Sequence, residues 1–478
     1  MAIVIRRESF GGLIADPHSY NTRILNHSAF EALRVANRVD SIPSELRSHL
    51  TKLGFDLWNQ GFRVVDQIDH SCMGTVLSAP LIFWFELTDL CPLRCQHCFL
   101  PPAEREPVAL EIDAVECLLQ ELHTLGVPRI TLTGGEALVY PYIDRVVQLA
   151  HDLGFGLRLF TSGCLGPWHR SRLCTFPLDW IFISIDGGER SHDELRGKGS
   201  YAEVVQCLRE LVATGHISRT TISTTLDRVN LREMPGVFEL ASELGVRAIL
   251  LRILMHYDWS RQSPLRKFTS KQEVFEAVNY LMDLSVKWNV EVQLNKLPFF
   301  PVSKTVFMDD SPLNASLGAV IGREPTGDCV GGNLVCGVRA DGTVIPCGFI
   351  PFAYDTGENN SIYNRSFAWL WHNSKNLRML RQLKLPVACA SCPKHSVCTG
   401  GCRANPIVFG VDVNSLDPYC LYHETLLGEP VVQVGDLSRY SAKQKHLSPT
   451  EHWFKSMTPM VSEELIVSKC GWIGDGYA

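Results

Sequence analysis

The chain has 478 residues, of which 45% are hydrophobic and 20% charged, as in an ordinary soluble protein of two to four modules. Its 51 acidic and 45 basic residues give a net charge of -6, and no basic block indicates a nucleic-acid surface. No long apolar run or secretory signal occurs. We therefore expect a cytoplasmic protein that binds neither nucleic acid nor membrane.

The first 70 residues or so predict a small domain of short strands followed by helices. Residues 2–6 and 12–15 are apolar runs separated by glycines, which is typical of short strands joined by turns. Residues 26–36 begin with a capping asparagine and continue with helical spacing of apolar positions, and residues 41–50 repeat this pattern. We expect three strands and a few helices here.

Between residues 80 and 290, apolar strands alternate with amphipathic helices, which indicates an α/β domain of parallel strands joined by helical crossovers. The expected strands are residues 82–87, 129–133, 157–161, 180–185, 219–225 and 247–253. The expected helices are residues 109–125, 142–153, 201–213, 231–244 and 271–286. The proline-rich residues 291–328 predict an irregular connector, and residues 421–478 carry no motif that we can name.

Three cysteines follow the first of these strands at a spacing typical of an iron-sulfur cluster. Cys91, Cys95 and Cys98 form a C-x3-C-x2-C run, which can bind three irons of one [4Fe-4S] cube and leave the fourth iron open. An open iron is a site for chemistry. Zinc is the alternative, but His97 lies too close to Cys98 in sequence to complete a tetrahedron comfortably.

This loop, with the apolar run at 81–88 before it and the sequence Thr-Gly-Gly-Glu at 133–136 after the second strand, resembles that of radical S-adenosylmethionine (SAM) enzymes. The resemblance implies a partial (β/α)6 barrel in which the amino and carboxylate groups of SAM chelate the open iron. It also implies that one electron from the cluster cleaves SAM to a 5'-deoxyadenosyl radical, which abstracts a substrate hydrogen. Both motifs fall at the carboxyl ends of strands, where barrel enzymes carry their chemistry.

The same resemblance implies a set of SAM contacts. They are His97, Gly134, Gly135, Glu136, Ser162, Ser184, Asp186 and Arg252. The Gly-Gly-Glu motif is expected at the amino group of SAM, with glycines permitting close backbone approach. The residues after the third and fourth strands are expected at its ribose or methionyl part, although plain turns are the alternative. We expect His97 near the adenine, and Arg252 at the SAM carboxylate or a surface acid.

A second set of cysteines, between residues 329 and 420, resembles the SPASM domain, which holds two auxiliary [4Fe-4S] clusters in many radical SAM enzymes. Carried over to this sequence, the pattern assigns the first auxiliary cluster to Cys329, Cys347 and Cys402. It assigns the second to Cys389, Cys392, Cys398 and Cys420. Cys336 is the candidate fourth ligand of the first cluster, which otherwise has an open iron. Zinc is the alternative here too.

Related sulfatase-maturing enzymes carry a catalytic aspartate directly after the second cysteine of this set. Here Gly348 follows Cys347, which disfavours sulfatase maturation and leaves any proton acceptor unidentified.

The N-terminal pattern, including residues 10–14, resembles the winged-helix-like PqqD domains that recognise peptides for radical SAM maturases. A structural cap or a DNA-binding winged helix is the alternative. We predict an enzyme that cross-links, epimerises or rearranges a ribosomally made precursor peptide, binds the leader of that peptide at residues 1–70, and takes electrons from a flavodoxin or ferredoxin. The rival functions are maturation of a folded protein partner and an iron-sulfur electron carrier or DNA-binding sensor.

Overall fold

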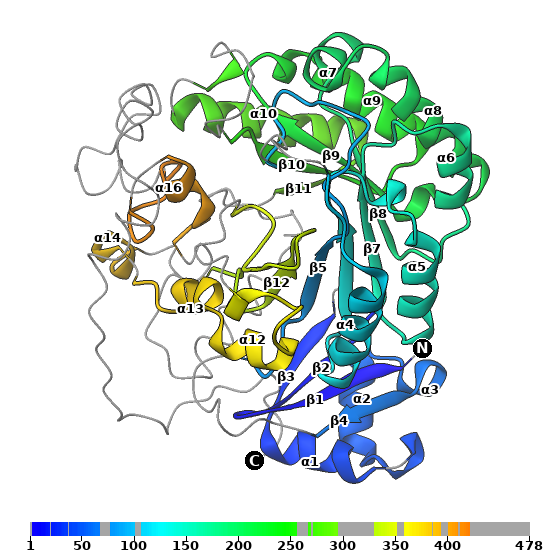
Figure 1. Cartoon of the computed structure of the whole chain (residues 1–478), viewed down its shortest axis with the longest axis vertical. Coiled ribbons are helices and arrows are strands. Elements are labelled where there is room, and N and C mark those ends of the chain that lie inside the picture. Colours follow the sequence, from blue (N-terminus) through cyan, green and yellow to red (C-terminus); the bar gives the residue numbers. More distant parts are fainter. Residues whose placement is uncertain are drawn as a thin grey trace.

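The computed structural model describes residues 2–420 except 20, 37, 67–76, 101–106, 256–265, 269–270, 295–328, 351–357, 385, 393–399 and 410–411. It shows a small N-terminal domain, a large sheet covered by helices on one side, and a C-terminal domain on the other side (Figure 1). No helix in this described part is long and apolar enough to cross a membrane.

The N-terminal domain is a four-stranded sheet packed against three helices. The strands are β1 (Ile3–Glu8), β2 (Gly11–Ala15), β3 (Thr22–Leu25) and β4 (Phe62–Val65), in the order β3-β2-β1-β4. The helices are α1 (His27–Val35), α2 (Ser44–Lys52) and the short α3 (Leu57–Gln60). The predicted cap is confirmed, because the Asn26 side chain accepts a hydrogen bond from the Ala29 amide. The fourth strand, β4, was not predicted. It pairs in parallel with β1, although most of the domain's sequence separates the two strands.

A buried arginine joins this domain to the rest of the protein. Arg6 on β1 bonds the Glu8 carboxylate at 2.7 Å, and both side chains are only 2% exposed. The same guanidinium donates to the carbonyls of Ala79 and Gly126, which precede strands of the large sheet. Burial raises the pKa of Glu8, and the charge of Arg6 and the hydrogen bonds from Ser78 oppose this rise.

A second buried arginine, on the large sheet, donates hydrogen bonds to the N-terminal domain. Arg129, fully buried at the start of β6 (Arg129–Thr133), donates to the carbonyls of Asp16 and Ser19 and to the Thr22 hydroxyl. Buried carbonyls that a charged donor satisfies are costly to expose, so the N-terminal domain is firmly docked at the amino ends of the strands.

Seven parallel strands follow one another in chain order across the large sheet. They are β5 (Ile82–Glu86), β6, β7 (Gly156–Thr161), β8 (Trp180–Ser184), β9 (Thr220–Leu226), β10 (Ala248–Ile253) and β11 (Glu291–Leu294). Helices α4 (Ile112–Thr124), α5 (Ile143–Asp152), α6 (Pro167–Leu173), α7 (Glu189–Arg196), α8 (Ser200–Ala213), α9 (Met234–Leu244) and α10 (Lys271–Trp288) cover one side. All six predicted strands and all five predicted helices of this region are confirmed. The expectation of an irregular connector is wrong at its start, where β11 extends the sheet beside β10.

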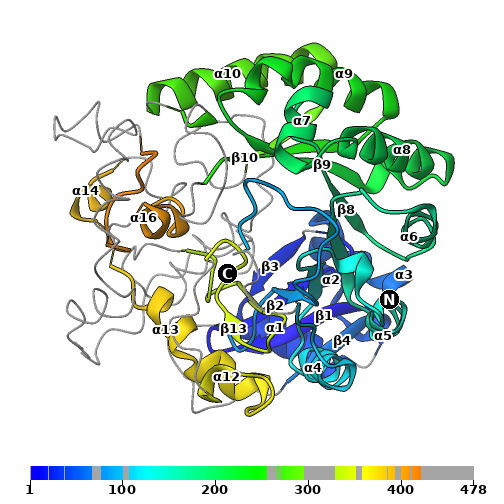
Figure 2. The ribbon, with the colours of Figure 1, turned by 45° about the horizontal axis from the view of Figure 1, so that its top comes forward.

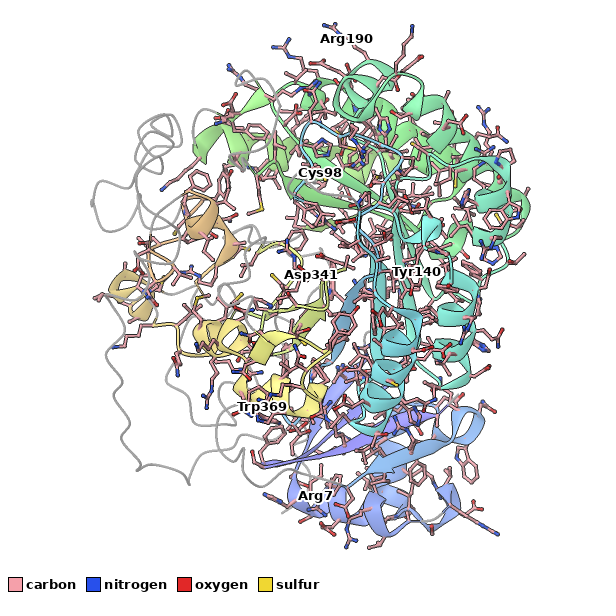
Figure 3. All side chains as sticks on the ribbon, in the orientation of Figure 1. Arg7, Cys98, Tyr140, Arg190, Asp341 and Trp369 are labelled. Atoms are coloured by element: carbon pink, nitrogen blue, oxygen red, sulfur yellow. The ribbon has the colours of Figure 1, made fainter. Side chains whose placement is uncertain are left out.

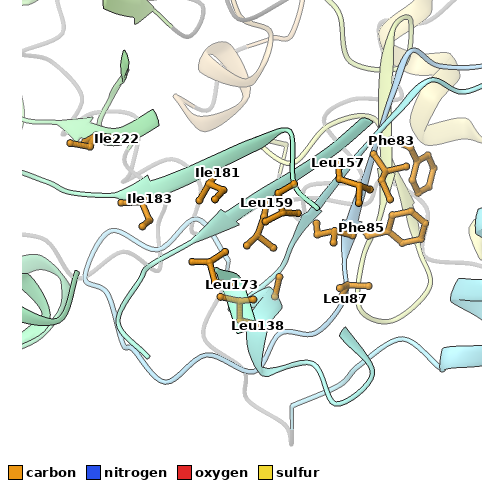
Figure 4. Packing of buried hydrophobic residues seen from close by; sticks show 14 of the residues in the cluster. Phe83, Phe85, Leu87, Leu138, Leu157, Leu159, Leu173, Ile181, Ile183 and Ile222 are labelled. Carbon is orange, nitrogen blue, oxygen red and sulfur yellow. The ribbon is translucent and has the colours of Figure 1, made fainter. Parts of the chain in front are cut away.

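Alternation along the strands separates the helix side of the sheet from its interior. Phe83 and Phe85 on β5, like Leu157 and Leu159 on β7, pack into the main core beneath the helices (Figure 4). Trp84, between the two phenylalanines, points to the opposite side and lines the central pocket. The same period of two that predicts the strands therefore decides which residues can reach a substrate.

The C-terminal domain continues the large sheet. Strand β12 (Val335–Val338) pairs in parallel with β5, and β13 (Val344–Ile345) closes a hairpin at the edge. Four short helices complete the described part of this domain: α12 (Phe367–Asn373), α13 (Lys375–Arg381), α14 (Val387–Ala390) and α16 (Ala404–Val408). The sequence predicted the domain but not this main-chain pairing with the barrel, which is distant in sequence.

Replacing Arg6 by leucine should destabilise the N-terminal domain by about 3–5 kcal/mol, because it leaves the buried Glu8 carboxylate without its charged partner. The loss should shrink in acid, since a buried carboxyl whose pKa is raised is harmless once protonated. Hydrogen exchange of the β1 and β2 amides measures this free energy.

Arg7→Leu is the matched control. Arg7 lies on the outer surface (Figure 3), pairs with half-exposed Glu31 and Asp66, and should cost less than about 1 kcal/mol. Equal losses in the two variants would contradict the proposed docking.

Candidate active site

The loop after β5 brings the three cysteines of the first motif together. Cys91, Cys95 and Cys98 are each half-buried and line one pocket, and Cys98 lies in the upper part of the view in Figure 3. Burial raises the pKa of the Cys91 thiol to about 12 and that of Cys98 to about 11, and the neighbouring cysteines add to both shifts. Thiols in this setting ionise readily only when a cation binds them, as cluster irons do.

The two glycines of the second motif hold this loop in place. Gly135 donates its amide to the Thr88 carbonyl at 2.7 Å, and Glu136 donates to the Leu90 carbonyl at 2.9 Å. A Cβ atom on Gly135 would lie 2.5 Å from the carbonyl oxygens of Asp89 and Leu90. Only glycine permits this approach, so the motif positions the segment that leads into Cys91.

Glu136 itself turns away from the pocket and ties two strand ends together. Its carboxylate accepts hydrogen bonds from the amide and the hydroxyl of Ser162, both at 2.8 Å. The side chain is almost fully buried, and burial raises its pKa. It therefore supports Ser162, which lines the pocket after β7.

On its other side, the cysteine loop contacts an ion pair at the end of α7. Arg196 Nε lies 2.6 Å from the fully buried Asp186 carboxylate, and its Nη1 lies 3.9 Å from the Cys95 sulfur. His97 Nε2 lies 3.3 Å from the same carboxylate. Burial alone would raise the pKa of Asp186, but the charges of Arg196 and His97 hold it well below its usual value.

Hydrogen bonds to the backbone of α7 also hold the cysteine loop. The Gln96 amide donates to the Leu195 carbonyl at 2.8 Å, and the Gln96 side chain donates to the Glu194 carbonyl at 2.8 Å, so the loop lies on the last turn of α7 (Figure 2). Arg196 was missed in the sequence, where a basic residue near a helix end is common and gives no distinct signal.

The pocket has a volume of about 200 Å³ and lies between the cysteine loop, the carboxyl ends of the strands and the C-terminal domain. Of the expected SAM contacts, six line it: His97, Gly134, Gly135, Ser162, Ser184 and Arg252. Glu136 and Asp186 lie behind this lining and support it. The C-terminal domain contributes the following residues to the wall: Gly348, Phe349, Cys402, Asn405 and Tyr419.

The C-terminal cysteines also gather in two groups. Burial raises the pKa of Cys347, and the nearby Cys329 and Cys402 raise it further. Burial likewise raises the pKa of Cys389 to about 11, with Cys420 and Cys392 adding to the shift. These two groups correspond to the two sets implied by the resemblance; the remaining member, Cys398, lies outside the described residues.

Cys336 stands apart from both groups. It lies on β12 opposite Phe83 of β5, is fully buried, and belongs to the main hydrophobic core. Cys329, Cys347 and Cys402 pack instead in a separate cluster of the C-terminal domain. The structure therefore does not bring the candidate fourth ligand to the first auxiliary set.

Comparison with known proteins gives matches to two families. Residues 85–241 match the Radical SAM superfamily, and residues 329–393 match SPASM, an iron-sulfur cluster-binding domain. The chain therefore contains a radical SAM domain and a SPASM domain. The predicted enzyme class, fold class and cofactors, SAM with one SAM-binding and further auxiliary [4Fe-4S] clusters, are confirmed.

Relatives cover most of this radical SAM enzyme. It is 28% identical over 367 residues to mycofactocin maturase MftC of Mycobacterium ulcerans, which spans 75% of this chain and 91% of the relative. It is 27% identical over 361 residues to an AdoMet-dependent heme synthase of Methanosarcina barkeri, spanning 73% and 99%. Streptococcus suis SuiB bound to precursor peptide SuiA has the same fold, with a TM-score of 0.67 at 14% identity over 88% of this chain and 98% of SuiB.

The described residues of the radical SAM enzyme fit its cofactors. The three thiols stand beside a cavity whose wall includes the close-packed backbone of Gly134 and Gly135. Among these described residues, no three or more Cys, His, Asp or Glu side chains are placed so that they could hold one metal ion.

Replacing Cys336 by alanine should leave the electron paramagnetic resonance spectrum of the auxiliary clusters unchanged, because its thiol is buried in the main core. The variant should lose only about 1 kcal/mol of stability. Cys347→Ala is the control and should alter the spectrum. A changed spectrum in Cys336→Ala would show that this thiol is a ligand.

Proposed function

We propose that this radical SAM enzyme modifies a ribosomally synthesised precursor peptide by cross-linking, epimerisation or backbone rearrangement. The observation that carries the proposal is the shared pocket, because Cys98 of the first motif and Cys402 of the C-terminal domain line the same cavity. A substrate held there lies between two redox-active groups. The similarity to a mycofactocin maturase and to SuiB with its precursor peptide supports a peptide substrate.

The proposed cofactor ligands are the groups that the fold brings together. Cys91, Cys95 and Cys98 hold the cluster that, with SAM bound, supplies the hydrogen-abstracting radical. Gly134, Gly135, Ser162, Ser184 and His97 form the wall against which SAM lies. Arg196 and Asp186 keep the loop in one conformation, and Glu136 keeps Ser162 in place.

The auxiliary ligands follow the two groups of the C-terminal domain. Cys329, Cys347 and Cys402 hold the first cluster, and Cys389, Cys392, Cys398 and Cys420 hold the second. Since Cys336 lies in the main core, three thiolates of the described residues would hold the first cluster, and none of the other described cysteines would bind its fourth iron. A flavodoxin or ferredoxin is the proposed electron donor.

The N-terminal domain is the proposed binding site for the leader of the peptide. The similarity to SuiB covers 88% of the chain, and residues 80–478 alone are too few to make up that share, so the match extends into this domain. Its sheet ends at β3, a short edge strand to which an extended peptide can add by main-chain hydrogen bonds.

The position of this domain sets a minimum length for the substrate. It contacts the amino ends of the barrel strands through Arg129, whereas the pocket lies at their carboxyl ends. Strands of five to seven residues span about 20 Å, so at least about six extended residues must separate the bound leader from the modified residue.

The experiments below also distinguish the alternative functions. Maturation of a folded protein requires a larger entrance than a peptide does, and a DNA-binding sensor requires no substrate turnover. Heme synthesis is the second candidate, because the Methanosarcina relative is matched over nearly its whole length.

Anaerobically reconstituted protein should carry about twelve irons per chain in three clusters. Joint replacement of Cys91, Cys95 and Cys98 by alanine should remove one cluster and all release of 5'-deoxyadenosine, while the C-terminal clusters keep their spectra. With a precursor encoded beside this gene, the parent enzyme should produce a mass change that this variant does not. Iron near four per chain, stoichiometric zinc, or heme formation without peptide modification would contradict the proposal.

Replacing Ile24 by proline should weaken leader binding about three- to tenfold, because it removes one edge N–H from β3. Asp16 donates its amide to the Asn21 carbonyl, and bonded pairs alternate along β2 and β3, so the backbone groups of Ile24 point to the outer edge. Calorimetry against leaders from neighbouring short reading frames measures the effect.

Ile24→Ala is the control, since it removes the partly buried side chain and keeps the N–H. Equal leader affinity in the two variants would show that the peptide does not use this edge.

A further inference from the structure

Two polar side chains of the C-terminal domain are buried at the pocket with part of their hydrogen-bonding capacity unused. Asn405, on α16, and Tyr419, next to Cys420, are each only 5% exposed, and both line the pocket. The Asn405 side-chain oxygen and the Tyr419 hydroxyl form no hydrogen bond with another described residue. Neither atom is fully covered. Both are therefore accessible, and the pocket is the space that the two side chains share.

One carboxylate fixes the position of both residues. Asp417 accepts a hydrogen bond from the Asn405 side-chain nitrogen at 3.0 Å and another from the Tyr419 amide at 2.9 Å. Because the carboxylate accepts, the nitrogen of the Asn405 amide faces Asp417 and its oxygen points away. The Tyr419 ring meets the Phe409 ring edge-on at 5.5 Å, which fixes its direction. Both polar groups are therefore held in place before a ligand enters.

The two groups together suit a ligand that has both a donor and an acceptor. The Asn405 oxygen can only accept a hydrogen bond, whereas the Tyr419 hydroxyl can donate one. Every residue of a peptide main chain offers an N–H and a C=O. A carboxylate offers acceptors alone and leaves the Asn405 oxygen without a partner. Since a ligand that fills the pocket displaces its water, any polar group left unpaired there costs free energy.

Asn405 and Tyr419 belong to a different wall of the pocket from the expected SAM contacts. The expected contacts that line the pocket, such as Gly134 and Ser162, come from the cysteine loop and the carboxyl ends of the barrel strands. Asn405 and Tyr419 come from the C-terminal domain, whose helix α16 lies to the left of the barrel strands in Figure 1. A cofactor bound against the barrel wall therefore leaves these two groups to the substrate.

We propose that Asn405 and Tyr419 bind the main chain of the peptide substrate in the pocket. The Asn405 side-chain oxygen accepts a hydrogen bond from a peptide N–H, and the Tyr419 hydroxyl donates one to a peptide C=O. The proposal rests on the peptide-modifying function and names the part of the substrate that the pocket recognises. Main-chain hydrogen bonds supply affinity with little demand on sequence. The leader thus selects the peptide, and this wall orients the residue that reacts.

The test uses the complete, cluster-loaded enzyme with SAM bound, without reductant, and small fluorine-labelled probes. The amide probe is N-acetyl-fluorophenylalanine N-methylamide, which has an N–H on each side of the labelled residue. Each of two ester probes replaces one of these N–H groups by oxygen. They are N-acetyl-fluorophenylalanine methyl ester and the N-methylamide of O-acetyl-fluorophenyllactic acid. Fluorine resonance line widths give the three affinities.

In the parent enzyme, at least one ester should bind about three- to tenfold more weakly than the amide, because it loses the hydrogen bond to Asn405. Tyr419→Phe removes only a hydroxyl and should weaken binding of the amide probe about three- to tenfold. Its SAM affinity, measured by equilibrium dialysis, should stay within about twofold of the parent. Tyr140→Phe is the matched control, because the Tyr140 hydroxyl donates to the Leu110 carbonyl at 2.8 Å, outside the pocket. This control should bind all three probes as the parent does.

Several results would overturn the proposal. They are equal affinity for the amide and both esters, an unchanged amide affinity in Tyr419→Phe, and no binding of the amide up to about 10 mM. A joint fall of SAM and amide affinity in Tyr419→Phe would make Tyr419 a cofactor contact instead. If that variant does not fold, the comparison of amide and esters in the parent still decides. The mass change of the precursor is measured separately, so this subsite and the peptide-modifying function can fail independently.

Discussion

The structure depends on holding one short cysteine loop in a single conformation. A loop has no regular main-chain hydrogen bonds of its own, so contacts with neighbouring segments must fix its conformation. Here the backbone amides of Gly135 and Glu136 fix the segment before Cys91, and the Asp186 and Arg196 pair fixes the segment around Cys95. Both supports come from the carboxyl ends of neighbouring strands or the helix that follows. The barrel therefore serves as a frame that prepares three thiols for one cluster.

The C-terminal domain is part of that frame rather than an appendage. Its strand β12 adds to the barrel sheet beside β5, the strand that leads into the cysteine loop. Main-chain pairing fixes both distance and register, which side-chain contacts between separate domains do less strictly. Trp84 on β5 and Phe349 of the C-terminal domain consequently meet in the pocket, and Cys402 reaches the same cavity as Cys98.

The N-terminal domain is docked by a different type of interaction. Arg6 and Arg129 are buried guanidiniums that satisfy carbonyls on the opposite partner. Such contacts are directional and costly to break, because each leaves several polar groups without partners. The domain is thus placed at a fixed distance and angle from the barrel, at the end remote from the pocket. On the proposal that this domain binds the leader, its fixed position would also set which residue of the peptide reaches the pocket.

The sequence by itself determined what is written in local patterns. Cysteine spacing predicted the cluster loop at Cys91–Cys98, and the family resemblance assigned the C-terminal cysteines to two further groups. Periods of 3.6 and 2 located six of the seven described parallel strands and five of the seven helices within a few residues, because these signals arise between near neighbours. Tertiary structure decided what depends on distant segments: the pairing of β12 with β5, the role of Arg196, and the orientation of Cys336. Cys336 and Cys347 are alike in sequence context, but strand pairing turns the first into the core. The spacing of cysteines along the chain does not show which way a side chain points, because that direction depends on the strand that pairs with it.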